Sequence, residues 1–304
     1  MKEELVEKIN KLKKERNAVI LAHNYQTGPV QDIADFTGDS LGLSQKAART
    51  DAYVIVFCGV LFMAETAAIL SPDKTVLIPD KNAGCPMSDM ITAQQLRKLK
   101  ADHPGAIVVC YVNSSAEVKA ESDYCCTSSN AIEVVKAVPA GKQIIFVPDC
   151  HLGQYVKGRS GRDIVLWAGY CPTHMWFNEA SVKDAKRQHK DALVLMHPES
   201  SEDAKPLADE LLSTGQMLQY ARQSDADEFI IATEVGIIHT LQKECPAKKF
   251  YAVTERAVCP NMKLITLEKI LFSLENMEYK VAVPVEIARR ARGSLDRMLS
   301  IFPK

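Results

Sequence analysis

The segment TVLIPDKNAGCP, residues 75–86, contains the pattern that decides the fold. It joins a short apolar run of β type to a loop that ends in a Cys-Pro pair. The same pattern recurs in DIVLWAGYCP, residues 163–172, and in KFYAVTERAVCP, residues 249–260. The cysteines of the three segments are 86 and 88 residues apart, in the order Cys85, Cys171 and Cys259. One motif at a nearly constant spacing indicates an internal repeat.

Other landmarks follow the same period. The apolar runs AVILAHNY, AIVVCYVN and ALVLMHPE align at His23, Tyr111 and His197, with spacings of 88 and 86 residues. A hydroxyl-rich helix start follows each run at the same spacings, at Ser40, Ser128 and Thr214. Near-continuous apolar runs that alternate with amphipathic segments are typical of parallel strands covered by helices.

The repeat predicts an α/β protein of three homologous three-layer αβα domains with small parallel sheets, arranged around a pseudo-threefold axis. Equivalent positions of the three copies then face one another at the centre. We place the first domain at residues 1–84 together with 265–304, the second at 85–170 and the third at 171–264. The stretch 265–304 is helical in character and is expected to fold back onto the first repeat.

The composition is that of an ordinary globular protein. Of the 304 residues, 47% are hydrophobic and 25% are charged, which allows a buried core. The formal net charge is -1, so no basic field attracts nucleic acid, and no apolar run is long enough for a membrane span. The nine cysteines are an odd number and are better explained as reduced thiols than as disulfides. With no apolar stretch of a secretion signal at its start, the sequence predicts a cytoplasmic protein without nucleic-acid or membrane partners.

The three repeat cysteines are candidate metal ligands. Each lies in a loop at the carboxyl end of a predicted strand, where α/β sheets place their sites. A single free cysteine is usually a small buried hydrophobic residue, but three equivalent Cys-Pro loops indicate that the thiols meet. We interpret Cys85, Cys171 and Cys259 as ligands of one oxygen-sensitive iron–sulfur cluster, because three cysteines leave one iron of a 4Fe-4S cluster open as a Lewis acid. The spacing alone does not exclude zinc, although structural zinc sites normally have four ligands.

Polar side chains follow the first strand of every repeat and begin the next helix. The strand ends are His23-Asn24-Tyr25, Tyr111-Val112-Asn113 and His197-Pro198-Glu199, which contain phenols and, in Glu199, a candidate general base. The helix starts carry hydroxyls as candidate N-caps, at Ser40, Ser128 and Ser213-Thr214. Helix N-termini that converge on one axis bind carboxylates or phosphate without Lys or Arg. The sequence thus predicts a site for a small anionic substrate, and it leaves open whether His174 lines that site or only packs.

Many of these segments resemble one family, the quinolinate synthases, which are iron–sulfur enzymes of NAD biosynthesis. The resemblance runs over nearly the whole chain and is specific, because several of the shared motifs are long. They are AHNYQ, QDIADFTGDSL, VIVFCGVLFMAETA, the GCPM loop, YVNSSAEVKAESD, TSSNA, VPDCHLGQYV, HPES, STGQM and CPNM. The resemblance implies three αβα domains about a pseudo-threefold axis and one 4Fe-4S cluster held by a cysteine from each domain.

The resemblance also implies an activity and a set of site residues. The expected reaction condenses iminoaspartate with dihydroxyacetone phosphate to quinolinate, with loss of phosphate and water. Matched residue by residue, the cluster ligands are Cys85, Cys171 and Cys259. The substrate-binding set is His23, Ser40, Asn113, Ser128, Ser213 and Thr214, and the catalytic set is Tyr25, Tyr111, His197 and Glu199. L-Aspartate oxidase or aspartate dehydrogenase is the expected partner that supplies iminoaspartate.

The sequence departs from the family pattern at two positions. Ser200 stands where many members have cysteine, and Arg256 stands where longer bacterial relatives have the first cysteine of a Cys-x-x-Cys pair. The chain therefore lacks a thiol next to Glu199 and one cysteine of a redox-active disulfide. Neither departure removes an expected cluster ligand. From the residues alone three other functions stay open: another iron–sulfur dehydratase or lyase, a non-catalytic iron–sulfur sensor or electron carrier, and a zinc-dependent aldolase or lyase.

Overall fold

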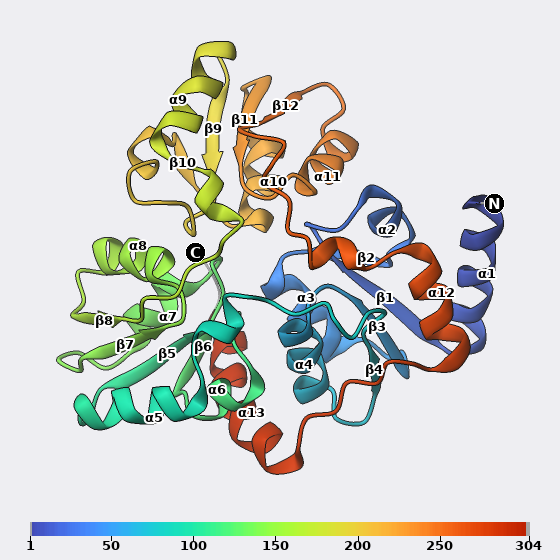
Figure 1. The fold of residues 1–304 in the computed structure, drawn as a ribbon, viewed down its shortest axis with the longest axis horizontal. Coiled ribbons are helices and arrows are strands. Elements are labelled where there is room, and N and C mark those ends of the chain that lie inside the picture. The colour runs from blue at the N-terminus through green and yellow to red at the C-terminus, as the bar shows by residue number, and fades with distance from the viewer. Residues whose placement is uncertain (1, 302–304) are drawn as a thin grey trace.

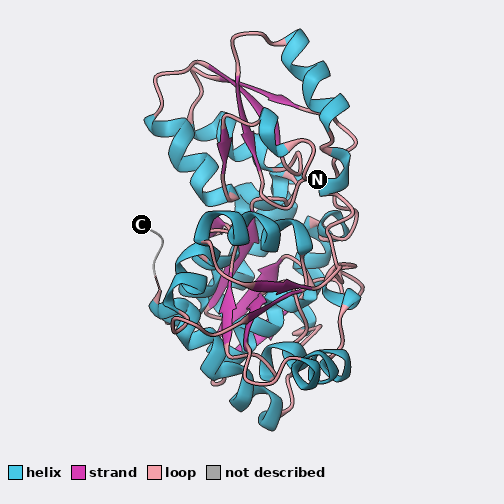
Figure 2. Cartoon of the chain, turned by 90° about the vertical axis from the view of Figure 1, so that its left-hand side faces the viewer, coloured by secondary structure: helices cyan, strands magenta, loops and turns pink. Residues whose placement is uncertain are grey.

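Three parallel sheets of four strands form the framework of the molecule, and they surround a common centre (Figure 1). The computed structural model describes residues 2–301. The strand orders are β2-β1-β3-β4, β6-β5-β7-β8 and β10-β9-β11-β12, so the chain repeats one topology three times. Helices flank each sheet (Figure 2). The predicted α/β fold of three homologous αβα domains is therefore confirmed.

The elements follow one another in a similar order in each repeat. The first repeat contains α1 (Lys2–Glu15), β1 (Ala18–His23), α2 (Gly28–Ile33), β2 (Phe36–Gly38), α3 (Ser40–Arg49), β3 (Val54–Cys58), α4 (Leu61–Leu70) and β4 (Thr75–Leu77). The second contains η1 (Ser88–Met90), α5 (Ala93–Asp102), β5 (Ile107–Tyr111), α6 (Ala116–Ala120), β6 (Tyr124–Cys126), α7 (Ala131–Ala137), β7 (Ile144–Val147), α8 (Cys150–Ser160) and β8 (Ile164–Leu166). The third contains η2 (His174–Trp176), α9 (Glu179–Gln188), β9 (Leu193–Met196), η3 (Lys205–Leu207), β10 (Glu210–Leu211), α10 (Thr214–Gln223), β11 (Glu228–Ala232), α11 (Ile237–Glu244) and β12 (Lys249–Ala252). The chain then continues through η4 (Met262–Leu264), α12 (Leu267–Asn276) and α13 (Val285–Ser300), and no helix within the described residues has the length and apolar composition to cross a membrane.

An aspartate recurs in register with the strands and fixes each sheet in the same way. The carboxylates of Asp35, Asp123 and Asp209 accept the backbone N–H of Ile20 at 2.8 Å, of Val108 at 2.8 Å and of Val194 at 2.7 Å, respectively. Each aspartate also donates its own N–H to the carbonyl of that same strand residue. The three aspartates are 88 and 86 residues apart, so the period found in the sequence is also a period of hydrogen bonds. These contacts satisfy a backbone N–H and a backbone C=O of the first strand in each sheet, at the point where the second strand begins beside it.

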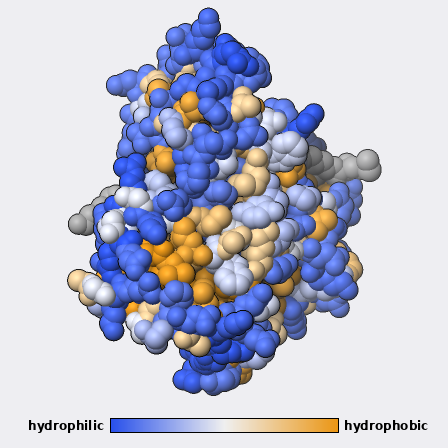
Figure 3. Space-filling view, turned by 60° about the vertical axis from the view of Figure 1, so that its left-hand side comes forward, coloured by the Kyte–Doolittle hydropathy of each residue, from blue (hydrophilic) through white to orange (hydrophobic). Residues whose placement is uncertain are grey.

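The hydrophobic cores divide the molecule unequally. Residues of the first and second sheets belong to one continuous core, which also takes in Ile270 of α12 and Leu295 of α13. The third sheet has clusters of its own on its two faces, because alternate residues of β11 point to opposite sides. Ile230 lies in one cluster and Phe229 in the other. The surface of this third repeat, at the top of Figure 3, is mainly hydrophilic, whereas hydrophobic residues gather lower on the same view.

The C-terminal helices pack in two places. Helix α12 lies against α1 of the first repeat, whereas α13 packs against α6 and β6 of the second repeat and against α4 of the first. Arg292 of α13 donates to the carbonyl of Leu70 at 3.0 Å, and Asn130 of the second repeat donates to the carbonyl of Met298 at 3.1 Å. Helix α13 thus ties the first two repeats together. The domain boundaries 1–84 with 265–304, 85–170 and 171–264 stay a prediction.

Candidate functional site

One cavity lies where the carboxyl ends of strands from all three sheets meet. About 620 Å³ of space, which includes open solvent at its mouth, lies between its lining residues. Twelve of the thirteen residues predicted for the site line this cavity: His23, Tyr25, Ser40, Cys85, Tyr111, Asn113, Ser128, Cys171, His197, Glu199, Thr214 and Cys259. The other, Ser213, is fully buried next to Thr214, and its Oγ lies 2.8 Å from Oγ of Ser129. The fold therefore gathers the predicted set in one place, and the individual roles stay proposals.

The three cysteines enter the cavity from equivalent loops. Each is followed by Pro and then by a short 3-10 helix, which is η1, η2 or η4. In every loop the backbone N–H of the residue three positions on, which is Ser88, His174 or Met262, acts on the sulfur and lowers the pKa of the thiol. Burial raises the pKa of all three thiols, that of Cys85 to about 12, and these N–H groups act in the opposite direction. Such donors stabilise the thiolate, which is the form that binds metals.

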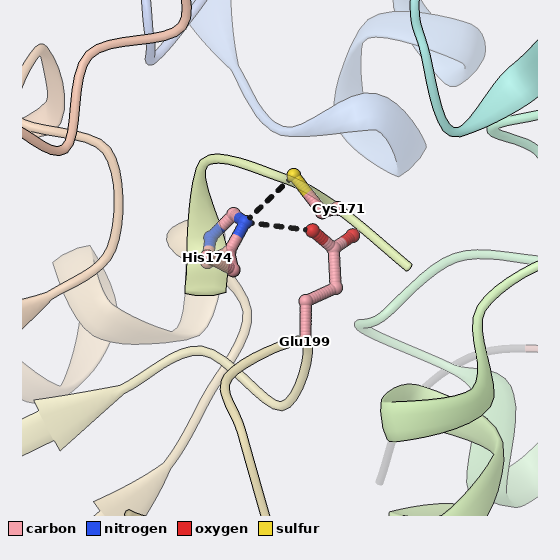
Figure 4. Close-up of side chains that lie close together, drawn as sticks. All are labelled: Cys171, His174 and Glu199. Atoms are coloured by element: carbon pink, nitrogen blue, oxygen red, sulfur yellow. Dashed lines mark hydrogen bonds and ion pairs between the residues drawn. The ribbon is translucent and has the colours of Figure 1, made fainter. Parts of the chain in front are cut away.

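The donor set fits a group that is held by three thiolates. All nine cysteines lie in the described part of the chain and are free thiols, but only Cys85, Cys171 and Cys259 line the cavity. Within residues 2–301 there is thus no fourth cysteine to complete a four-thiolate zinc site, whereas a cluster with one open iron needs three. A second combination also exists, because Cys171, His174 and Glu199 bring ligand atoms within 4.8 Å of one another (Figure 4). A single metal ion could use that sulfur, nitrogen and oxygen set.

A continuous chain of hydrogen bonds links the two tyrosines of the cavity. The hydroxyl of Tyr25 lies 2.5 Å from Oγ1 of Thr233, which lies 2.9 Å from Nε2 of His174. Nδ1 of His174 is 2.9 Å from Oε2 of Glu199 (Figure 4). The hydroxyl of Tyr111 donates to Oε1 of Glu199 at 2.5 Å. A carboxylate only accepts hydrogen bonds, so Nδ1 of His174 donates to Glu199, and in the neutral tautomer Nε2 then accepts from Thr233.

The charges in the cavity are acidic. Its carboxylates belong to Asp39, Glu199 and Glu234, and no Lys or Arg is among the described residues that line it. Burial alone raises the pKa of Glu199, but the nearby histidines and the hydrogen bonds from His174 and Tyr111 bring it down to about 2. Glu199 is therefore ionised at neutral pH. An anionic ligand must be held here by neutral donors and by whatever metal the thiols bind.

His23 and His197 are such neutral donors. Burial lowers the pKa of both imidazoles to about 3. Nδ1 of His23 accepts the N–H of Tyr25 at 3.1 Å, and Nδ1 of His197 accepts the N–H of Glu199 at 3.3 Å. Each ring therefore carries its proton on Nε2, and Nε2 of His197 lies 3.1 Å from Oγ of Ser128. Both rings can donate an N–H to a bound anion without carrying a charge.

Two of the predicted helix caps are wrong. The N-cap of α3 is Asp39, whose Oδ1 accepts the N–H of Gly42 at 2.8 Å, so Ser40 is the first residue of the helix. The N-cap position of α7 is Asn130, because that helix begins later than its hydroxyl cluster suggests, and Ser128 stays in the preceding turn. The cap of α10 is confirmed, since Ser213 forms a capping box with Gln216. Ser40 and Ser128 are thus not occupied by capping, and both line the cavity.

Sequence reasoning missed Thr233 and Glu234 and left His174 open. Thr233 and Glu234 directly follow β11, at the same sheet edge as the ends of β9 and its neighbours, so their place after a strand was an available signal. Oε1 of Glu234 accepts the N–H of Cys259 at 3.1 Å and pairs with Nζ of Lys263 at 2.8 Å. Glu234 therefore fixes the third cysteine loop. His174 lines the cavity and lies 3.1 Å, through Nδ1, from Sγ of Cys171.

The buried histidines predict a loss of stability in acid. The pKa of His23 and His197 is about 3 in the folded chain, against an ordinary value of 6.5. Between these values the unfolded chain binds protons that the folded chain does not, so the free energy of unfolding falls as the pH drops below 6.5. Urea unfolding at about pH 7.5 and about pH 5.5 measures this difference.

Two variants separate the histidines from other titrating groups. We expect His23→Gln to reduce the dependence of the unfolding free energy on pH, because that position then binds no extra proton on unfolding. The matched control is His103→Gln, since His103 is bonded to Gln143 and does not line the cavity. Equal pH dependence in His23→Gln and in the unchanged chain would mean that His23 is not held neutral.

The chain is similar over nearly its whole length to proteins of one family. A family model described as Quinolinate synthetase A protein matches residues 7–300. The quinolinate synthase of Dehalococcoides mccartyi (strain CBDB1) is 56% identical over 294 residues, which is 97% of each chain. The quinolinate synthases of Methanosarcina barkeri (strain Fusaro / DSM 804) and Geotalea uraniireducens (strain Rf4) are each 54% identical, over 298 and 299 residues and 98% of each chain. The similarity therefore includes all three repeats and the three cysteine loops.

Proposed function

This chain belongs to the quinolinate synthase family, and from that premise we propose that it condenses iminoaspartate with dihydroxyacetone phosphate to quinolinate. Phosphate and water are lost in the proposed reaction. The observation that carries the proposal is that the loop after the last strand of each sheet brings one cysteine to a single cavity, together with neutral donors for anionic groups.

We further propose that Cys85, Cys171 and Cys259 hold a 4Fe-4S cluster. When bound, such a cluster supplies a Lewis-acidic iron that polarises an oxygen of the substrate. The support lies in the three equivalent loops, each of which directs a backbone N–H at its sulfur. All nine cysteines, which lie within the described residues, are free thiols. Free thiols fit the cytoplasmic location predicted from the sequence, because that compartment keeps them reduced.

The anionic groups of the substrates are held by uncharged side chains in this proposal. His23 and His197 offer Nε2–H groups, and the hydroxyls of Ser128 and Thr214 line the same cavity. Asn113 contributes an acceptor, since its Oδ1 is buried and has no partner within the described residues. A buried polar atom without a partner is costly unless a ligand or water satisfies it. The Asn113 amide is therefore suited to an N–H or O–H of the substrate.

Proton transfer is assigned to the hydrogen-bonded chain between the tyrosines. Glu199 is ionised and acts as the general base, and it is reached either directly or through the hydroxyl of Tyr111. His174 stabilises that carboxylate with its Nδ1–H. At the other end, a proton that leaves Tyr25 passes through Thr233 to Nε2 of His174. When His174 in turn passes its Nδ1 proton to Glu199, that carboxyl group can return a proton to the substrate through the hydroxyl of Tyr111. The chain of hydrogen bonds then takes up a proton at Tyr25 and delivers one at Tyr111, as a condensation followed by a dehydration needs.

Substitutions of Thr233 test this chain of hydrogen bonds. Its hydroxyl is the connection between Tyr25 and His174, so we expect Thr233→Val to lower kcat about 10- to 100-fold with little change in KM. Thr233→Ser keeps the hydroxyl and is expected to stay within about threefold of the unchanged enzyme. Steady-state kinetics under anaerobic conditions measure both. If the Val and Ser variants turn over equally fast, the hydroxyl does not transfer protons.

The proposed function is tested on protein purified without oxygen. We expect about four irons and four sulfides per chain and formation of quinolinate when dihydroxyacetone phosphate is added with iminoaspartate. Iminoaspartate is best generated in the assay by L-aspartate oxidase or aspartate dehydrogenase, which we propose as its source in the cell. An intact cluster without quinolinate formation would point to another iron–sulfur dehydratase or lyase, or to a non-catalytic sensor.

A zinc-dependent lyase is the second candidate, and one observation favours it. Cys171, His174 and Glu199 offer a sulfur, a nitrogen and an oxygen to a single ion. This set of ligands does not include Cys85 or Cys259, however, and so does not explain why two further Cys-Pro loops enter the same cavity. A colourless protein that contains zinc after anaerobic reconstitution with iron and sulfide would support the zinc lyase and contradict the cluster.

A further inference from the structure

Asp39 is a carboxylate on which all three repeats converge. It lies between β2 and α3, and its Oδ1 accepts the N–H of Gly42 at 2.8 Å. Its Oδ2 accepts the hydroxyl of Ser129, from the second repeat, at 2.5 Å, and Oγ of Ser129 lies 2.8 Å from Oγ of Ser213 in the third. The backbone of Gly215 approaches so closely that a Cβ there would lie 2.7 Å from Oδ2. The Asp39 carboxylate is therefore fixed in place while it lines the cavity.

Asp39 differs from the other two carboxylates of the cavity in its partners. Glu199 accepts a hydrogen bond from His174, and Glu234 is paired with Lys263. The hydrogen bonds of Asp39 come from a hydroxyl and a backbone amide, which are neutral. Because no Lys or Arg within residues 2–301 lines the cavity, no cationic side chain there offsets the charge of Asp39. Any anion that enters meets this charge.

A fixed negative charge is unexpected beside hydroxyls that suit an anion. Ser40, Ser128 and Thr214 line the same cavity as Asp39. A cavity made only of such hydroxyls and of imidazole N–H groups binds a free phosphate as readily as the phosphate group of a substrate. Coulomb repulsion from a carboxylate weakens the binding of every anion, but a substrate has additional contacts that compensate and free phosphate has none.

We propose that Asp39 is a specificity-determining residue that weakens the affinity of the cavity for inorganic phosphate, so that phosphate leaves after the reaction. The inference rests on the proposed function, in which phosphate is a product. It deepens that function, because it assigns the release of this product to one side chain. Asp39 also positions Ser129 and α3, so its charge has to be tested separately from its hydrogen bonds.

Asp39→Asn removes the charge and can keep the contacts. The amide oxygen of Asn still accepts the N–H of Gly42, and its NH₂ group donates to Oγ of Ser129 in place of accepting from it. The hydroxyl of Ser129 then turns to Ser213. Asp39→Ser is a second uncharged variant, since Ser caps a helix about as well as Asp does. Two controls keep the charge: Ser129→Ala breaks the contact with Ser213, and Asp35→Asn changes an aspartate that bonds the backbone elsewhere in the same repeat.

The experiment measures the affinity of inorganic phosphate for the anaerobic holoenzyme by calorimetric titration. We expect the Kd of phosphate to fall about fivefold to tenfold in Asp39→Asn and in Asp39→Ser, and to stay within about twofold in the two controls. The inhibition constant of phosphate in the quinolinate assay should fall by the same factor. Thermal unfolding and iron content of each variant show whether it is folded and loaded.

The outcomes separate the two proposals. If the unchanged enzyme forms quinolinate and both uncharged variants bind phosphate no more tightly than Ser129→Ala does, then the inference is wrong and the function stands. If Asp39→Asn fails to fold, Asp39→Ser decides by the same criterion. If the unchanged holoenzyme forms no quinolinate, the proposed function fails, and the inference about product release fails with it.

Discussion

Cys171→Ala is expected to yield a colourless protein that forms quinolinate at less than about a thousandth of the rate of the unchanged enzyme. With one of three thiols gone, the cavity keeps Cys85 and Cys259 and too few ligands to hold a cluster. The same result is expected for alanine at Cys85 or at Cys259, because the three loops are equivalent in their N–H to sulfur contacts. Iron and sulfide analysis, an absorption spectrum and the quinolinate assay measure the effect.

The matched control for these variants is Cys150→Ala. Cys150 is a free and partly exposed thiol, like the three proposed ligands, but it begins α8 and does not line the cavity. We expect this variant to keep its colour, its iron and its activity. Wild-type iron content in any of the three cavity variants would exclude that cysteine as a ligand, and equal losses in Cys150→Ala would indicate a nonspecific effect of removing thiols.

Glu199→Gln is expected to lower kcat about 10²- to 10⁴-fold while the protein keeps its iron. Glu199 is the only member of the tyrosine-to-tyrosine chain that is an anion at neutral pH, and its two oxygens are bonded to Tyr111 and His174. Glutamine has nearly the same shape but cannot take up a proton at this position. Glu199 is not one of the three proposed cluster ligands. We therefore expect its replacement to lower turnover far more than it lowers the iron content.

Glu202→Gln provides the comparison for Glu199→Gln. Glu202 lies three residues further on, and its half-exposed carboxylate pairs with His151 and Lys205, away from the cavity. We expect near-normal turnover from this variant. Single-turnover kinetics on both proteins show whether the slow step is the chemistry. A Glu199→Gln enzyme as fast as Glu202→Gln would remove Glu199 from proton transfer.

The repeated framework could be predicted from the sequence because the repeat is visible in the residues themselves. Apolar runs of β type, the Cys-Pro loops and the hydroxyl-rich turns recur at spacings of 86 and 88 residues. Parallel strands place their carboxyl ends at one edge, so residues such as His23, Tyr111 and His197 were expected to meet. The same period is found in Asp35, Asp123 and Asp209. Their hydrogen bonds to the strands could not be predicted, however, because an aspartate in a loop has no sequence pattern that indicates such a bond.

The remainder of the site could not be predicted, because it depends on contacts without a repeat. Tyr25 reaches Thr233 only once the third sheet is placed against the first, and nothing in the spacing of these residues indicates this contact. Asp39 caps α3 in place of Ser40, and the N-cap position of α7 falls on Asn130, two residues after Ser128, because several residues in these turns are suited to that position. Helix α13 has an amphipathic pattern that shows which side is buried but not which repeat covers it.

The spread of the three thiols over loops far apart in the sequence has a consequence for biosynthesis. A nascent chain that has emerged only as far as Cys171 offers two of the three thiols, and the third arrives 88 residues later with Cys259. The helix that joins the first two repeats, α13, is made later still. The proposed cluster needs all three sulfurs, so it can be inserted only after Cys259 has been made, and a chain truncated before that residue does not acquire it.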